Sequence, residues 1–179
     1  METPDLCPDA RLEAVARALG WPGDVARDVD LLGDRVDVVY GWEEERHRAR
    51  DRVGLGPLAD PWVFRCASAP DGGLADHPCP VQIVGVVVRR GSWRVARRVA
   101  AGFTGLAQAA VLLPAGRVSE LDRADADRLG LGVVLDAQEP VVAVRPARYE
   151  APAWTPVQDL AREIVYASAV TWMAASGRR

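Results

Sequence analysis

The sequence predicts an α/β fold in which a mixed central sheet is flanked by helices. Segments with helical periodicity alternate along the chain with short valine-rich segments, and this alternation is typical of layered α/β proteins. The run Val81 to Val88 is apolar at nearly every position, as expected for a strand buried on both faces in the middle of such a sheet. The 179 residues are expected to form a single domain, residues 1–179, with a core over about 9–145 and a C-terminal helix over about 155–176.

Helix and strand signals alternate in the first half of the chain. Leu12, Val15 and Leu19 share one face of a helix that Asp9 can cap. A later charged segment has acids first and arginines last, the order that a helix dipole favours. In chain order we expect a helix over residues 9–19, a strand within 30–42, a helix over 43–53, a strand over 62–66 and an exposed loop over 68–80.

Serine and glycine residues mark the helix boundaries of the second half. Ser92 precedes a segment in which Val95 and Val99 share a helical face, and Ser119 begins a capping-box pattern that Gly130 closes. In chain order we expect a strand over residues 81–88, a helix over 92–108, a strand over 110–113, a helix over 119–130, strands over 133–135 and 141–144, and a helix over 155–175.

The composition excludes several chemistries. Every one of the 22 basic side chains is arginine, so a Walker-type phosphate loop and a Schiff-base enzyme are both excluded, because each requires a lysine. A net charge of -3 argues against a nucleic-acid coat protein or a polybasic membrane binder. The N-terminal residues lack the apolar core of a secretory signal, and no stretch is long enough to span a bilayer, so we expect a cytoplasmic protein with no membrane partner.

The three cysteines are Cys7, Cys66 and Cys79, an odd and sparse set that fits a reducing compartment. Cys66 and Cys79 with His77 are the right residue types for a zinc site, but their spacing matches no zinc motif. We therefore expect no metal there.

The order helix, three strands, crossover helix, strand resembles the core of the restriction-endonuclease-like PD-(D/E)XK superfamily, over roughly Asp9 to Leu135. In that family an Asp on one strand and a Glu-x-Lys on the next hold Mg²⁺, which supplies a water nucleophile for cleaving a phosphodiester. Asp37 matches the first position. The resemblance therefore implies a nuclease-like fold whose site includes Asp37.

The second position departs from the family pattern. The residues before the Gly91-Ser92 helix start are Val87-Val88-Arg89, so valine replaces the carboxylate and arginine replaces the lysine. Valine cannot bind a metal, and arginine is permanently charged. The resemblance thus implies a degenerate site, and any remaining activity would involve Asp37, Gln82 and Arg89, with Glu43 or Gln82 as the displaced ligand.

Five arginines without an intervening acid form the densest charged cluster in the sequence. They suit phosphate or another anion, although a solvated face and a site for an acidic protein remain alternatives. The five are Arg89, Arg90, Arg94, Arg97 and Arg98.

The last helix is apolar around most of its second half, so it must be buried either by its own domain or by a partner or second copy of the chain. The candidate interface residues are Ile164, Val165, Val170, Trp172 and Met173.

Taken together, these features predict a non-catalytic, nuclease-like binding or assembly module that contacts nucleic acid or a protein partner and needs no cofactor. The alternatives are a metal-dependent nuclease with a displaced ligand, the one case that requires Mg²⁺, and a small-molecule enzyme of another α/β family. A homodimeric scaffold is a third interpretation.

Overall fold

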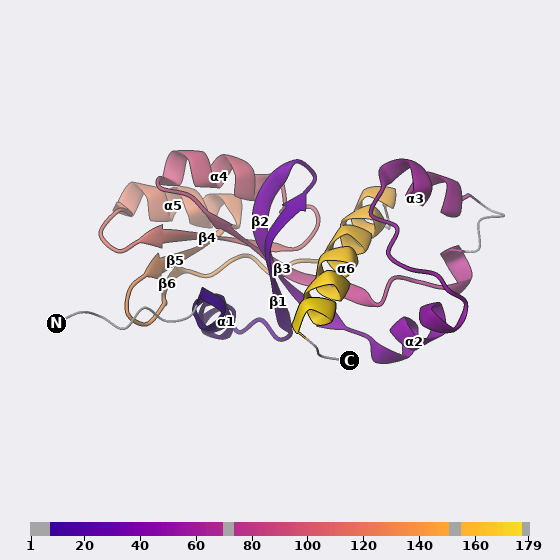
Figure 1. Ribbon diagram of the computed structural model, residues 1–179. Coiled ribbons are helices and arrows are strands. Elements are labelled where there is room, and N and C mark those ends of the chain that lie inside the picture. Colours follow the sequence, from indigo (N-terminus) through magenta and orange to yellow (C-terminus); the bar gives the residue numbers. More distant parts are fainter. Residues whose placement is uncertain (1–7, 70–73, 151–154, 177–179) are drawn as a thin grey trace.

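A computed structural model describes residues 8–69, 74–150 and 155–176, which form a six-stranded mixed sheet flanked by helices (Figure 1). The predicted α/β class, including the C-terminal helix, is confirmed. Within the described ranges no helix is long and apolar enough to cross a membrane.

The strands lie in the sheet in the same order as in the chain. The central pairs β3–β4 and β4–β5 are parallel, whereas β1–β2, β2–β3 and β5–β6 are antiparallel. The strands are β1 (Asp24–Leu31), β2 (Asp34–Trp42), β3 (Val81–Arg89), β4 (Gln108–Pro114), β5 (Gly132–Asp136) and β6 (Val141–Val144).

The helices cover the sheet unequally. Buried residues of α4, α5 and α6 share one apolar core with one face of the sheet, and α1 packs against the other face. The described helices are α1 (Pro8–Leu19), α2 (Glu44–Arg52), α3 (Pro61–Ala67), the short 3-10 turn η1 (Leu74–Asp76), α4 (Trp93–Ala101), α5 (Glu120–Leu129) and α6 (Pro156–Ser176).

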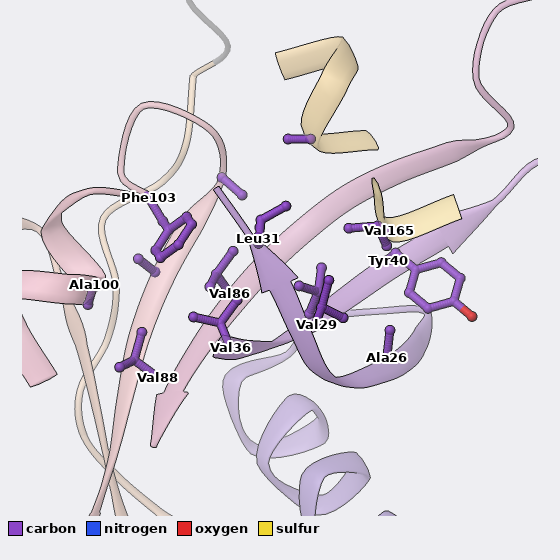
Figure 2. Close-up of a cluster of buried hydrophobic side chains, with 14 of the residues drawn as sticks. Ala26, Val29, Leu31, Val36, Tyr40, Val86, Val88, Ala100, Phe103 and Val165 are labelled. Carbon is purple, nitrogen blue, oxygen red and sulfur yellow. The ribbon is translucent and has the colours of Figure 1, made fainter. Parts of the chain in front are cut away.

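Alternation along the strands assigns side chains to the two faces. Figure 2 shows Val86 and Val88 of β3 in the larger core with Val36 of β2, Phe103 and Val165. Val87 points to the opposite face and joins the smaller core beneath α1. The apolar run of β3 is therefore buried on both sides, as the sequence predicts.

The structure adds a strand that the sequence analysis missed. β1 pairs with β2, but its pairing register shifts between Ala26 and Val29. This β-bulge interrupts the alternation of apolar residues by which a strand is recognised, because Arg27 and Asp28 both lie exposed between buried neighbours.

The strand expected over residues 62–66 is wrong, because these residues belong to helix α3. Asp60 is the N-cap, and its Oδ1 accepts hydrogen bonds from the backbone N–H groups of Trp62 (2.8 Å) and Val63 (2.9 Å). Pro61 occupies the first helical position, where its missing N–H costs nothing.

The helix expected over residues 92–108 is too long. It ends at Ala101 with Gly102 as its C-cap, and Gln108 already begins β4. Its buried face also differs from the expected one, since Ala96 and Ala100 are fully buried while Val95 is 53% exposed. The cap expected at Ser119 is confirmed by a complete capping box with Asp122.

Candidate functional site

Asp37 is a buried carboxylate in the middle of the sheet, on the α1 face. It is 1% exposed and lies between valines of β2. Two side-chain hydrogen bonds from Arg89 hold it: Nε donates to Oδ2 at 2.5 Å and Nη2 donates to Oδ1 at 3.0 Å. A buried carboxylate requires such a partner, because removing an ionised carboxylate from water without a compensating partner costs on the order of several kcal/mol of folding free energy. The sequence-predicted residues Asp37 and Arg89 are therefore brought together.

Asp28 completes this cluster from the bulge in β1. Its backbone N–H donates to Asp37 Oδ1 at 3.1 Å, and its carboxylate Oδ1 accepts from Arg89 Nη2 at 3.1 Å. Asp28 has a φ of 49°, a left-handed conformation that Asp tolerates better than most residues at a cost of roughly 1 kcal/mol. The bulge thus supplies a third partner that no local motif in the sequence indicates.

Arg89 is a cation at any physiological pH, and its neighbours stabilise the charged form further. Its hydrogen bond with Asp37 raises the guanidinium pKa above its ordinary value, and the charges of Asp37 and Asp28 act in the same direction. The cluster therefore contains a permanent cation bonded to two carboxylates.

Val87 lies directly opposite Asp37 in the β2–β3 register and is 1% exposed. Gln82 does not approach this cluster. It pairs with Gly41 near the other end of the β2–β3 ladder and has an exposed side chain. Asp37, Gln82 and Arg89 therefore do not form one site.

Glu43 and Gln82, the residues considered as displaced ligands, line a separate cleft between α2, residues 74–79 and α6. This cleft has a volume of about 510 Å³, the largest among those described. All three acids that line it are already paired: Glu43 with Arg46 at 2.7 Å, Asp159 with Arg162 at 2.9 Å, and Glu163 with Arg50 at 2.6 Å. Among the described residues, no group of three or more His, Cys, Asp or Glu side chains is placed to hold a metal ion.

The predicted arginine cluster is divided between two places in the fold. Arg89 points to the α1 face, and Arg90 donates to the backbone carbonyls of Arg89 (2.8 Å) and Arg35 (3.3 Å). Arg94, Arg97 and Arg98 lie on α4, which packs on the opposite face. The five side chains therefore do not form one continuous surface.

The three α4 arginines meet Arg128 of α5 in a hollow of about 320 Å³, whose remaining lining is Ala101 and Leu129. We call this the arginine groove. Asp125 bridges two of these arginines, because its carboxylate accepts hydrogen bonds from Arg97 and from Arg128, the latter at 2.8 Å. These bonds lower the pKa of Asp125, and the bond from Arg128 has the largest effect. Arg94 and Arg98 are exposed, so the groove has an excess of positive charge.

The C-terminal helix α6 packs against β1 and β3 of its own sheet. Val165 is fully buried in the larger core, so this structure leaves it no surface for a partner. Ile164 and Val170 are half-buried against the same core. Met173 is half-buried, and Trp172 is 45% exposed.

Sequence reasoning missed a second buried ion pair, between Arg50 of α2 and Glu163 of α6. Arg50 Nη2 donates to Glu163 Oε1 at 2.6 Å and Nη1 donates to Oε2 at 2.9 Å, and neither side chain is more than 1% exposed. The backbone N–H of Leu58 also donates to Glu163 Oε2 at 2.9 Å. The signal in the sequence was Glu163 itself, the last acid of that helix and the residue directly before its apolar second half.

Cys79 lies beside this pair. Burial, followed by the charge of Glu163, raises its thiol pKa to about 12, so the thiol stays protonated and is a poor nucleophile or metal ligand. Cys66 is exposed on α3. Cys7 lies outside the described residues.

No protein-family model, curated protein or solved structure matches this chain.

Proposed function

We propose that this protein is a non-catalytic binding module with a nuclease-like core, and that it holds nucleic-acid phosphates in the arginine groove. The observation that carries the proposal is the state of Asp37, whose carboxylate is bonded to a guanidinium and faces Val87. The succession of α1, β1, β2, β3, α4 and β4 supports the nuclease-like resemblance, although α2, α3 and η1 are inserted between β2 and β3. The direct pairing of Asp37 with Val87, the first residue of Val87-Val88-Arg89, supports it too.

Both carboxylate oxygens of Asp37 already accept hydrogen bonds, so they are not available to a divalent cation. Oδ2 accepts from Arg89 Nε, and Oδ1 accepts from Arg89 Nη2 and the Asp28 N–H. The guanidinium also repels a second cation, and Val87 offers no oxygen. Hydrolysis of a phosphodiester by the metal-dependent route needs that ion to activate water and neutralise charge, so the cluster supports folding in place of catalysis.

The arginine groove suits phosphate for a different reason. Its lining contains four arginines and no acid, and one adjacent carboxylate, Asp125, pairs with two of them. Guanidinium groups match phosphate oxygens in charge and geometry. Because the whole chain carries a net charge of -3, this groove is a local exception and gives a binding nucleic acid one preferred face.

The test compares two double variants in binding to a fluorescent oligonucleotide at low and high salt. The double variant Arg94→Ala/Arg98→Ala is expected to weaken binding by roughly tenfold. The slope of log affinity against log salt concentration is expected to decrease by the amount that corresponds to about one to two lost phosphate contacts. The control, Arg52→Ala with Arg65→Ala, removes the same charge from exposed arginines of α2 and α3. Equal weakening by both variants, or no binding by the native protein, would contradict the proposal.

The same preparations test for cleavage with Mg²⁺ and Mn²⁺ on DNA and RNA. Neither the native protein nor Asp37→Ala is expected to cut either substrate. Cleavage that Asp37→Ala abolishes would establish a metal-dependent nuclease in place of a binding module.

A further inference from the structure

The arginine groove is the first of three hollows in which each shares a lining residue with the next. It shares Leu129 with a hollow of about 300 Å³, and that hollow shares Tyr149 with a third of about 170 Å³. The third reaches Gln82 on β3 and Arg162 on α6. We call these three adjoining hollows the path, which extends from the α4–α5 surface, past the start of β4, to the start of β3.

The lining of the three hollows includes six arginines and one acid, Glu150. The excess of positive charge lies in the arginine groove, because the second hollow has both Arg148 and Glu150, and Arg162 of the third pairs with Asp159. Within the described part of the chain, no acidic side chain forms an ion pair with Arg94, Arg98 or Arg148. The lining arginines are Arg94, Arg97, Arg98, Arg128, Arg148 and Arg162.

Tyr149 stands where the second and third hollows meet, and its hydroxyl is fixed. It donates to the carbonyl of Gly105 at 3.2 Å and accepts from Gln158 Nε2 at 2.8 Å. Gln158 is itself only 7% exposed. An aromatic ring anchored in this way loses little freedom on binding and offers a flat surface on which a nucleobase can stack.

The third hollow offers polar groups beyond the ring. Gln82 has an exposed side chain there, and its amide can both donate to and accept from the edge of a base. Arg162 lines the same hollow and provides positive charge for the next phosphate, shared with Asp159. These groups extend the site past the end of the arginine groove.

We infer that this path binds a single strand of nucleic acid, with a base stacked on Tyr149 and the adjacent base edge read by Gln82. In a duplex the bases are paired and stacked inside the helix, so they cannot reach a ring that lines small hollows, whereas an unpaired strand presents them. The inference rests on the proposed function of the arginine groove and adds the substrate class.

The experiment measures, by fluorescence anisotropy, the affinity of the protein for labelled single strands of twelve uridines (RNA) or twelve thymidines (DNA) and for a blunt-ended hairpin duplex. The native protein is expected to bind the single strands at least about tenfold more tightly than the duplex. Tyr149→Ala is expected to weaken single-strand binding by about tenfold and leave duplex binding unchanged, since stacking accounts for that loss. Tyr149→Phe keeps the ring but loses the two hydroxyl hydrogen bonds that fix it, so its binding is expected to fall between that of the native protein and that of Tyr149→Ala.

Gln82→Ala provides a second variant whose side chain is exposed and whose loss does not disturb packing. It is expected to weaken single-strand binding by about threefold to fivefold, the effect of one lost hydrogen bond.

Two failures are distinguishable. If duplex and single strand bind equally and both Tyr149→Ala and Gln82→Ala are neutral, while Arg94→Ala with Arg98→Ala still weakens binding, the single-strand inference is overturned and the proposed function stands. If no oligonucleotide binds at low salt, both are overturned.

Discussion

Two arginine–carboxylate pairs stabilise buried acids in this protein, and they differ in how far water reaches the arginine. Arg50 and Glu163 are both buried, whereas the Arg89 side chain is 45% exposed over the buried Asp37. Water can replace part of what Asp37 loses when Arg89 is removed, but it cannot reach Glu163 in the same way. The two pairs therefore contribute unequally to stability.

This difference predicts the outcome of two matched substitutions. Arg50→Met is expected to lower the free energy of unfolding by about 3–5 kcal/mol, and Arg89→Met by about 1–2 kcal/mol, because the second carboxylate regains solvent. Urea titration followed by circular dichroism measures both. Arg65→Met, at an exposed position of α3, serves as the reference and is expected to change little. Equal losses at Arg50 and Arg89 would refute the argument.

The sequence pointed to Asp37 and Arg89 through the family resemblance, in which Asp37 matches the strand carboxylate and Arg89 stands in the lysine position before the Gly91-Ser92 helix start. It was silent about Asp28, since the contact depends on a bulge with a positive φ that no short motif encodes. Gln82 was placed on the correct strand, but the β2–β3 register puts it opposite Gly41, away from Asp37.

At the scale of single elements, two serines occupy N-cap positions with different contacts. Ser119 Oγ accepts from the N–H of Asp122 at 3.2 Å, and Asp122 Oδ2 accepts from the N–H of Ser119 at 2.9 Å. Ser92 begins α4 without any side-chain cap hydrogen bond. The serine residue alone therefore does not determine whether a helix end is stabilised.

Ser119→Ala is expected to lower the free energy of unfolding by about 1 kcal/mol, the usual loss of an N-cap bond. Ser92→Ala is expected to change it by less than about half that amount, because no cap bond is lost. Thermal unfolding of the two variants measures the difference. Indistinguishable midpoints would show that the capping box adds no stability.

Helices and strands were predicted correctly where the end signals and the pattern of apolar residues indicated the same element. Helix α5 has a capping box at Ser119 and a left-handed Gly130 at its end, and β3 is apolar at nearly every position from Val81 to Val88. The prediction failed at α3, where the valine and aromatic residues favour a strand but Asp60-Pro61 supplies a cap and a first turn. A seven-residue segment contains too few helical turns for apolar periodicity to distinguish a helix from a strand, so the Asp60 N-cap was the more reliable signal.

At the scale of the whole molecule, α6 is part of the core of this chain. Ala161, Val165 and Ala169 are at most 1% exposed and join the larger core. A buried acid at Val165 is therefore expected to unfold the protein, because it introduces an unpaired charge into that core.

Val165→Asp is expected to abolish the cooperative thermal transition, whereas Val157→Asp, on the same helix at a residue 51% exposed, is expected to remain folded. Circular dichroism and sedimentation velocity follow the two variants. A homodimeric scaffold built on this face predicts a different result, namely that Val165→Asp yields a folded monomer from a native dimer.

The distribution of charge over the molecule was the least predictable feature. Arg89 and Arg94 are five positions apart in sequence, yet they point to opposite sides of the sheet because a strand ends and a helix begins between them. Arg128 joins Arg94 only through the packing of α5 beside α4. Contiguity in sequence and contiguity on the surface are therefore different properties here.

The sequential strand order also bears on how the chain assembles during synthesis. Each new strand can add to the free edge left by the strand before it, so no strand has to enter between two that are already paired. The exception is the last helix, α6, which packs against β1, the first strand made. The apolar surface of β1 that α6 covers thus stays uncovered until α6 itself has been synthesised, so this part of the core closes only after all six strands have been made.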